Sequence, residues 1–364
     1  MASPPPLRLI EGSDPFAGFD AIIDVRSPAE FAEDHVPGAI NLPVLDDAQR
    51  AQVGTLYSQD SPFVARRLGA ALVARNIAAH LEERLQQHPR PWKPLVYCWR
   101  GGQRSGAMTT VLGQVGWGAR QLEGGYRAYR RRVLTDLEAW PARFAFIVLC
   151  GPTGSGKTAV LEALHAQGAQ TLNLEALAQH RGSVLGGSLE DTDPQPGQKA
   201  FESAMWDVLR RCDPQRPVYV ESESRRIGRL GIPAGLFAAL TASPCLRLEA
   251  SLEVRIAHLV ERYADIYGQP AALRRRLEFF VPLHGRVLVE KWQRWVDEGN
   301  WEALAEAMVS SHYDPAYRRG GDSLYRAKAA GPAVPLDSLA PDAIMQVAQH
   351  ILGLPRQPAE PQCP

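Results

Sequence analysis

Two loops in this chain combine residue types and spacings that suit chemistry on phosphorylated groups. The first spans residues 98–105 and reads Cys-Trp-Arg-Gly-Gly-Gln-Arg-Ser, a cysteine at the head of a turn rich in glycine and arginine. The second spans residues 151–158 and reads Gly-Pro-Thr-Gly-Ser-Gly-Lys-Thr, which fits the complete P-loop pattern. The sequence therefore predicts a thiol site and a phosphate-binding site in one protein.

The cysteine loop has the composition of an anion-binding nest. Successive backbone N–H groups of a glycine-rich turn converge on one concavity, and Arg100 and Arg104 add positive charge beside Cys98. Such surroundings lower the pKa of a thiol and stabilise the thiolate, which is the reactive form. We therefore predict that Cys98 is catalytic and that the other four cysteines, Cys150, Cys212, Cys245 and Cys363, are not.

The spacing within this loop leaves a second interpretation open. Arg104 follows Cys98 in the Cys-(any five)-Arg pattern of cysteine phosphatases. A loop of this length would accommodate a tetrahedral phosphate-like group. The loop thus suits a phosphatase, or a thiol enzyme whose donor itself carries phosphate.

The P-loop predicts a phosphate cradle. Backbone N–H groups and the start of the following helix would hold a β-phosphate, Lys157 would neutralise the terminal phosphates, and the Thr158 hydroxyl could ligate Mg²⁺. ATP, GTP and an organic diphosphate satisfy the same physics, so the ligand stays open. The predicted phosphate-binding residues are Gly151, Thr153, Gly154, Ser155, Gly156, Lys157 and Thr158.

Four further residues are candidates near the phosphates. Glu221 and Glu223 end a predicted strand, where an acid that positions Mg²⁺ is expected, although a solvated strand end has the same pattern. His180 and Arg181 would add a cation, or belong to an ordinary loop. We predict no ligand set for a resident metal and no tightly bound cofactor, with Mg²⁺ only as a companion of the phosphate ligand.

Composition limits the function classes. Lys+Arg and Asp+Glu number 40 each, so only local patches could attract nucleic acid, and no basic or apolar leader or membrane-length run is present. An odd number of scattered cysteines predicts free thiols in a reducing, cytoplasmic setting. Candidate RNA-binding arginines are Arg225, Arg226, Arg229, Arg274, Arg275, Arg276, Arg286, Arg318 and Arg319, with Trp292, Trp295 and Trp301 as stacking partners or as core residues.

Alternating strand and helix patterns predict an α/β fold with parallel sheets. Strands are expected at residues 21–25, 95–98, 144–150, 217–223 and 246–249, with helices behind the two loops at 105–112 and 159–167. The pattern turns helical from Ser251. We predict a first domain over residues 1–140, a P-loop domain with a helical region over 141–320, and an extension over 321–364 that ends in a disordered tail.

Several stretches resemble known families. Residues 24–31 (Asp-Val-Arg-Ser-Pro-Ala-Glu-Phe) and 35–43 (His-Val-Pro-Gly-Ala-Ile-Asn-Leu-Pro) resemble the signature of rhodanese domains, and Cys98 resembles their sulfur-carrying cysteine. A rhodanese-like domain that leads into a P-loop domain resembles the tRNA 2-selenouridine synthase family, with support from residues 122–130, 180–183 and 220–225.

This resemblance implies a reaction. Members of the family replace the sulfur of 2-thiouridine with selenium from selenophosphate at the wobble position of tRNAs for lysine, glutamate and glutamine. They also use geranyl diphosphate to form an S-geranyl-2-thiouridine intermediate. The resemblance implies that Cys98 becomes S-selanylcysteine, that Arg100 and Arg104 hold the phosphate of the donor, and that the P-loop holds the diphosphate. An enzyme that supplies selenophosphate is a further expected partner.

Two other classes stay open from the residues alone. One is a cysteine-dependent phosphatase fused to a nucleotide-binding, kinase-like domain. The other is a nucleotide-switch protein in which the rhodanese-like domain serves only for docking.

Overall fold

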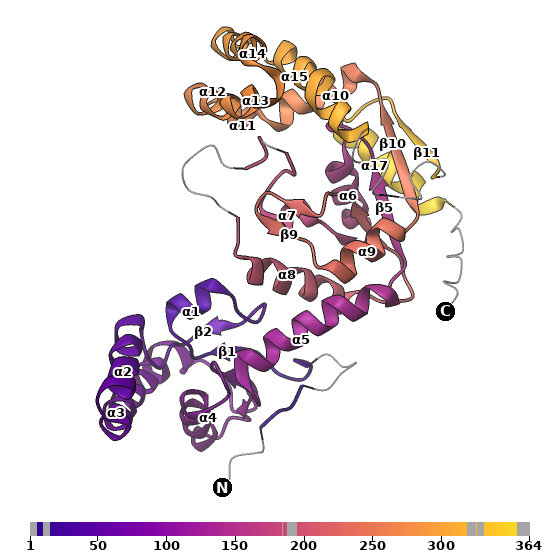
Figure 1. The fold of residues 1–364 in the computed structure, drawn as a ribbon. Coiled ribbons are helices and arrows are strands. Elements are labelled where there is room, and N and C mark those ends of the chain that lie inside the picture. Colours follow the sequence, from indigo (N-terminus) through magenta and orange to yellow (C-terminus); the bar gives the residue numbers. More distant parts are fainter. Residues whose placement is uncertain are drawn as a thin grey trace. The chain divides into compact units, whose positions relative to one another are not determined.

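The chain forms two compact units, drawn in Figure 1. The computed structural model describes residues 6–9, 15–183, 185–187, 195–318, 325 and 331–354. The first unit, here the cysteine unit, comprises Met1–Asp136 with Gly197–Arg210. The second, here the P-loop unit, comprises Leu137–Pro196 with Arg211–Pro364. Each contains its own parallel sheet with helices, which confirms the predicted fold class.

The sheet of the cysteine unit has the strand order β2-β1-β3-β4, and all its pairings are parallel. Its core joins Ile23 and Val96 of the sheet to Ile77, Met108 and Leu112 of the helices. The elements are β1 (Ala21–Asp24), α1 (Pro28–Glu33), β2 (Ile40–Asn41), α2 (Asp47–Gln59), α3 (Pro62–His80), a π-helical turn (Leu81–Leu85), β3 (Pro94–Tyr97), α4 (Gln103–Val115), β4 (Arg120–Gln121) and α5 (Gly125–Ala139).

Helix α8 (Gln198–Arg211) belongs almost entirely to the cysteine unit, although the predicted domain boundary at residue 140 placed it with the P-loop. Its Trp206 is fully buried and donates its indole N–H to Asp136 Oδ2 at 2.8 Å. The Trp206 ring also packs edge-on against Tyr129 of α5. The helix therefore packs by its aromatic face, a preference that its position in the sequence does not reveal.

The sheet of the P-loop unit has the order β11-β10-β5-β7-β6, again all parallel. The predicted strands at 144–150 and 246–249 are present as β5 and β10. The elements up to β10 are a 3₁₀ turn (Trp140–Arg143), β5 (Phe146–Cys150), α6 (Lys157–Ala166), β6 (Gln170–Leu172), α7 (Leu174–Ala178), β7 (Val218–Glu221), the hairpin of β8 (Arg226–Ile227) and β9 (Leu230–Gly231), α9 (Ala234–Ala242) and β10 (Cys245–Ala250).

A group of helices follows β10 and packs around its own core, in which Trp292, Phe280 and Leu273 are buried. Figure 1 shows these helices gathered together in orange within the P-loop unit. They are α10 (Leu252–Arg262), α11 (Ala264–Tyr267), α12 (Pro270–Leu277), a 3₁₀ turn (Glu278–Phe280), α13 (Val281–His284), α14 (Arg286–Glu298), α15 (Trp301–Met308) and a π-helical turn (Val309–Tyr313). The predicted helical region from Ser251 is therefore present.

The chain returns to the sheet after this helical group. Strand β11 (Ala333–Leu336) pairs with β10, and α17 (Pro341–Gly353) packs against α6 in the core of the P-loop unit. The predicted extension from residue 321 is therefore not separate from the P-loop domain, because residues 331–354 complete its sheet and core. The predicted disordered tail, which includes Cys363, lies outside the described residues. Over the described part of the chain, no helix is long and apolar enough to cross a membrane.

The place of α17 in the core gives a matched test of stability. Ile351 is buried in the core and its neighbour Leu352 is 40% exposed. We predict that Ile351→Ala lowers the free energy of unfolding by ~2–4 kcal/mol, because it leaves a cavity, whereas Leu352→Ala changes it by less than ~1 kcal/mol. Urea denaturation of the two variants measures the difference, and equal effects would contradict the packing of α17.

Candidate active site

Cys98 lies directly after β3, at the carboxyl end of a central strand. Its side chain is buried, and its sulfur accepts hydrogen bonds from the Gly102 N–H at 3.3 Å and from the Ser105 hydroxyl at 3.1 Å. Helix α4 begins at Gln103, so the sulfur also lies beside the positive end of a helix dipole. The loop is thus arranged to stabilise a sulfur anion.

Two opposing effects set the pKa of the Cys98 thiol. Burial of the sulfur raises the pKa because it removes the thiolate from water. Hydrogen bonds from Ser105 and Gly102, with the charge of Arg104, lower it and outweigh burial. The net pKa lies below the ordinary value, as the sequence predicted for a nucleophilic cysteine.

A double-glycine turn supports the back of the cysteine loop. The Tyr126 N–H donates to the Cys98 carbonyl at 2.8 Å, and the Arg127 N–H donates to the Trp99 carbonyl at 3.1 Å. Gly125 has a φ of +56°, and a Cβ there would lie 2.1 Å from the Cys98 carbonyl oxygen. Only glycine permits this approach, which explains the Gly-Gly pair within residues 122–130.

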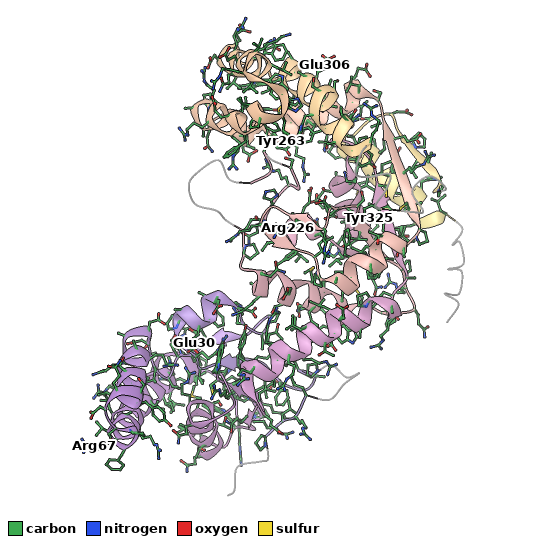
Figure 2. The ribbon with its side chains drawn as sticks, viewed as in Figure 1. Glu30, Arg67, Arg226, Tyr263, Glu306 and Tyr325 are labelled. Carbon is green, nitrogen blue, oxygen red and sulfur yellow. The ribbon has the colours of Figure 1, made fainter. Side chains whose placement is uncertain are left out.

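The two loop arginines have different environments. Arg104 forms an ion pair with Glu30 of α1 at 2.7 Å, which holds its guanidinium near the loop (Glu30 is labelled in Figure 2). Burial raises the pKa of Glu30, and the contact with Arg104 lowers it by a larger amount. The net pKa of Glu30 therefore lies below its usual value. Arg100 is exposed, and within the described residues it has no hydrogen bond or ion pair.

The P-loop connects β5 to α6, which is the strand-to-helix context that the motif requires. Gly154 and Gly156 adopt positive φ values of +83° and +79°. A Cβ at Gly154 would lie 2.9 Å from the Leu259 side chain, because α10 packs directly on the loop. The Lys157 ammonium donates to the Gly151 carbonyl at 2.9 Å, which places it at the mouth of the loop.

A cavity of about 220 Å³ opens beside this loop. Residues 153–158 line it, whereas Gly151 is buried and does not. An apolar and aromatic group from the helical region also lines the cavity: Leu259, Tyr263, Tyr313 and Tyr317. The basic side chains Arg181 and Arg262, the imidazole of His258 and the carboxylates of Glu175 and Glu223 also line the cavity. Burial lowers the pKa of His258.

The predicted acids take different positions. Glu223 lies past the end of β7 and lines the cavity, and Tyr325 holds its backbone through hydrogen bonds of 2.9 Å and 2.7 Å. Glu221 is fully buried outside the cavity lining, and its Oε1 accepts from the Glu175 N–H at 2.9 Å. Burial raises the pKa of Glu221 to about 7 and also raises that of Glu223, with a further increase from the charge of Glu175.

His180 and Arg181, which were predicted to add a cation near the phosphates, also occupy different positions. Arg181 lines the cavity and forms an ion pair with Asp265 at 2.8 Å. His180 does not line the cavity, and its Nδ1 accepts from the Gly182 N–H at 3.1 Å. Of these two residues, Arg181 is therefore the one placed to meet a phosphate.

Several site residues were missed in the sequence. Ser105 is the first, although the serine after the loop arginine was a usable signal. Glu175 on α7 is the second: it accepts from the Thr158 hydroxyl at 3.0 Å and from Arg262 at 3.4 Å. The third group is Tyr263, Tyr313 and Tyr317: the last two are one helical turn apart, but Tyr263 comes from a separate segment and no spacing links it to them. In the described ranges, no group of three or more His, Cys, Asp or Glu side chains could hold a metal ion.

Comparison with known proteins identifies the family. Residues 144–275 match the model of the tRNA 2-selenouridine synthase AAA domain, and residues 9–132 match that of the rhodanese-like domain. A tRNA 2-selenouridine synthase from Nitrosomonas europaea is 34% identical over 268 residues, which cover 72% of this chain and 67% of that protein. The synthase from Alcanivorax borkumensis is 31% identical over 354 residues, which cover 87% and 95% respectively. This chain belongs to the tRNA 2-selenouridine synthase family.

Some of the predicted RNA-contacting residues are buried in the core, and others are exposed on the surface. Trp292 is fully buried and Trp295 and Trp301 pack against the same core, so the stacking role considered for them is not available to Trp292. Arg274 forms an ion pair with Asp297. Arg225 and Arg226 are exposed beside the cavity residues 222–224, on the hairpin of β8 and β9. Arg319 lies outside the described residues.

The raised pKa of Glu221 predicts a dependence of stability on pH. The folded state binds the Glu221 proton up to a pH of about 7, whereas the unfolded chain releases it near the usual value of 4.5. Between these pH values the folded state holds more protons, so its stability falls as pH rises. We predict that Glu221→Gln removes this loss and is more stable than the wild type at pH 8, by up to roughly 3 kcal/mol.

Urea denaturation at several pH values measures this effect. The two proteins should converge at pH 4, where Glu221 is protonated in both states. Glu162→Gln, an exposed acid on α6, is the matched control and should leave the pH profile unchanged. A parallel profile for Glu221→Gln and wild type would contradict the assignment.

Proposed function

We propose that this protein replaces the sulfur of 2-thiouridine in tRNA with selenium from selenophosphate, through an S-geranyl-2-thiouridine intermediate. The observation that carries this proposal is the Cys98 sulfur, which is stabilised as an anion by Ser105 and Gly102 in a chain that also has a complete P-loop cavity. Relatives across the family are named as tRNA 2-selenouridine synthases, which supports a role in tRNA modification.

The P-loop cavity suits an activation step with geranyl diphosphate. Lys157 and the loop N–H groups would meet the diphosphate, and Leu259, Tyr263 and Tyr313 would contact an isoprenoid chain (Tyr263 is labelled in Figure 2). The thiocarbonyl sulfur attacks the allylic carbon, a C–S bond forms, and a C–O bond breaks as diphosphate leaves. Lys157 and Arg262 would absorb the charge that develops on diphosphate.

Mg²⁺ would bind with this ligand rather than as a resident ion. The Thr158 hydroxyl and the Glu175 carboxylate are 3.0 Å apart at the cavity. Together with diphosphate oxygens they supply the oxygen donors that Mg²⁺ prefers. The carboxylate from α7, rather than Glu221 at the strand end, is the acid that faces Thr158.

The second step uses the cysteine site. Selenium derived from selenophosphate adds at C2 of the geranylated base, and geranyl thiol leaves. A geranylated sulfur departs more readily than a thiocarbonyl sulfur, which is the chemical reason for the first step. Cys98 is the nucleophile that acts on the selenium donor, with Arg104 near its phosphate and Arg100 free to reach it from the surface.

The tRNA would be held through its phosphates. Arg225 and Arg226 are exposed, and among the described residues neither has an ion pair. Buried Gln195 anchors their hairpin by donating to the Ile227 carbonyl at 3.1 Å. The hairpin is thus held in place while its two exposed guanidinium groups, beside the P-loop cavity, can meet the phosphates of a polyanion. We place this reaction in the cytoplasm, with lysine, glutamate and glutamine tRNAs as substrates and a selenophosphate-supplying enzyme as a partner.

The alternatives from the sequence gain less support. A nucleotide-switch protein leaves the intact cysteine loop without a role, and neither of the two matching family models reported above is that of a phosphatase or a kinase, whereas the family match covers both units. Hydrolysis of a generic aryl phosphate at a useful rate, with unchanged selenation of tRNA in cells that lack this protein, would favour the phosphatase.

Point variants should separate the selenation step from the geranylation step. We predict that Cys98→Ala abolishes selenation of 2-thiouridine tRNA but retains geranylation, because the thiolate acts only in the second step. Lys157→Ala should weaken geranyl diphosphate binding by about 10- to 100-fold, the loss of a charge-assisted contact. Nucleoside mass spectrometry measures the products, and calorimetry measures the affinity.

Matched controls accompany both variants. Cys212→Ala removes a half-buried thiol whose pKa is raised by burial, and Lys291→Ala removes an exposed ammonium from α14. Both should leave activity and affinity unchanged. Intact selenation by Cys98→Ala would remove Cys98 from the reaction, and unchanged affinity of Lys157→Ala would remove the P-loop from diphosphate binding.

The hairpin arginines give a test of tRNA binding. We predict that Arg225→Ala with Arg226→Ala weakens tRNA binding and reduces the slope of log affinity against log salt by about 1.5–2, for two lost phosphate contacts. The matched control is Arg66→Ala with Arg67→Ala, an exposed pair on α3 (Arg67 and Arg226 are labelled in Figure 2). An equal loss in both double variants would contradict a specific role for the hairpin.

A further inference from the structure

One side of helix α10 faces the P-loop and the cavity beside it. The helical period places four of its residues on this side: Arg255, His258, Leu259 and Arg262. Arg255 donates to the Thr153 carbonyl at 2.9 Å, and the other three line the cavity. Helix α10 therefore presents the His258 imidazole to the molecules that the cavity binds.

The His258 imidazole is uncharged and has no fixed contact. Its neighbour one turn along the helix, Arg262, forms an ion pair with Glu175 at 3.4 Å, whereas His258 has no hydrogen bond or ion pair within the described residues. Burial lowers the pKa of His258, the charge of Arg262 lowers it further, and Glu261 raises it by a smaller amount. At neutral pH one ring nitrogen is therefore able to accept a proton.

Geranylation of a 2-thiouracil base releases a proton. The thiocarbonyl form carries a hydrogen on N3, and that hydrogen is lost when the sulfur is alkylated, because C2 then forms a double bond to N3. Removal of the proton during the attack moves negative charge onto sulfur and makes the sulfur a stronger nucleophile. A base in the cavity would therefore accelerate formation of the C–S bond.

The other possible proton acceptors of the cavity are engaged or already protonated. Glu175 accepts from the Thr158 hydroxyl and from Arg262. Glu223 lies close to Glu175, since a Cβ on Gly182 would be 2.7 Å from an oxygen of Glu175 and 3.1 Å from one of Glu223. Burial and this neighbouring charge raise the pKa of Glu223, which favours its protonated form. The oxygens of the departing diphosphate would face the cations of the P-loop, which lowers their basicity.

We propose that His258 is the general base of the geranylation step and takes the N3 proton of the 2-thiouracil base. The N3–H bond breaks and its electron pair forms the C2–N3 double bond. The π pair of the thiocarbonyl forms the new C–S bond, and the C–O pair leaves on diphosphate. The imidazolium then returns its proton to solvent. This inference rests on the proposed function, because it takes geranylation as the reaction of the P-loop cavity.

A variant that cannot take a proton tests the inference. Full-length His258→Gln is assayed with geranyl diphosphate and an anticodon stem-loop RNA that contains 2-thiouridine, and nucleoside mass spectrometry follows the product. We expect kcat to fall on the order of 100-fold, the usual contribution of a general base, with geranyl diphosphate affinity unchanged by calorimetry. Free imidazole should restore part of the activity of His258→Ala. His350→Gln, an exposed histidine on α17, is the matched control and should be fully active.

The pH dependence separates a base from a cation that holds diphosphate. A base acts uncharged, so the rate advantage of wild type over His258→Gln should shrink as pH falls from 8 to 5. An imidazolium that binds phosphate would show the opposite trend. Both proteins keep the same surrounding groups: Lys157, Glu175, Arg181 and Glu223 across the cavity, Glu261 and Arg262 on α10, and the tyrosines of the lining. The acids of α15, which packs against α10, are exposed.

A more acidic substrate should need the base less. Bromine at C5 withdraws electrons and acidifies N3–H, so the defect of His258→Gln should be smaller with 5-bromo-2-thiouridine. Equal rates for wild type and His258→Gln at every pH would mean that diphosphate or water takes the proton, and would overturn the inference while the proposed function stands. A loss of geranyl diphosphate affinity that accounts for the whole defect would also overturn it. If wild-type protein forms no S-geranyl product, the proposed function itself fails.

Discussion

The proposed chemistry depends on the stabilisation of one buried sulfur anion. Burial alone raises the pKa of the Cys98 thiol, and the hydrogen bonds from Ser105 and Gly102, with the charge of Arg104, bring it below its ordinary value. These donors are in place because the chain turns from β3 into α4 through glycines, and because Gly125 lets a second turn reach the Cys98 carbonyl.

The P-loop unit applies the same principle to a different anion. In both units a loop connects the carboxyl end of a parallel strand to the start of a helix, where backbone N–H groups are free. The helical group after β10 adds what the loop cannot supply, namely the apolar wall of Leu259 and Tyr263 and the charge of Arg262. Under the proposed function, this wall would let a diphosphate site also accept an apolar chain.

Much of the fold and the loop-borne part of both sites were predictable. Apart from Gly151, the predicted P-loop residues line the cavity, and the predicted strands at 144–150 and 246–249 are present as β5 and β10. Glu175 was not predictable, because a lone glutamate on a short helix has no spacing signal and acquires a role only when α7 faces Thr158. The domain assignments of α8 and β11 failed for a related reason: an amphipathic helix or an apolar strand carries no mark of the sheet it joins.

By itself, the sequence determined the two chemical loops, because their function depends on contiguous residues whose backbone conformation glycine permits. It also determined the alternation of strands and helices, which follows from local hydrophobic periodicity. Tertiary structure alone decided that Gln121 contacts Ser105, that Glu30 holds Arg104, and that Tyr263 shares a cavity with Tyr313 and Tyr317. Those contacts join residues far apart in the chain, and their distances depend on how the elements pack rather than on any local pattern.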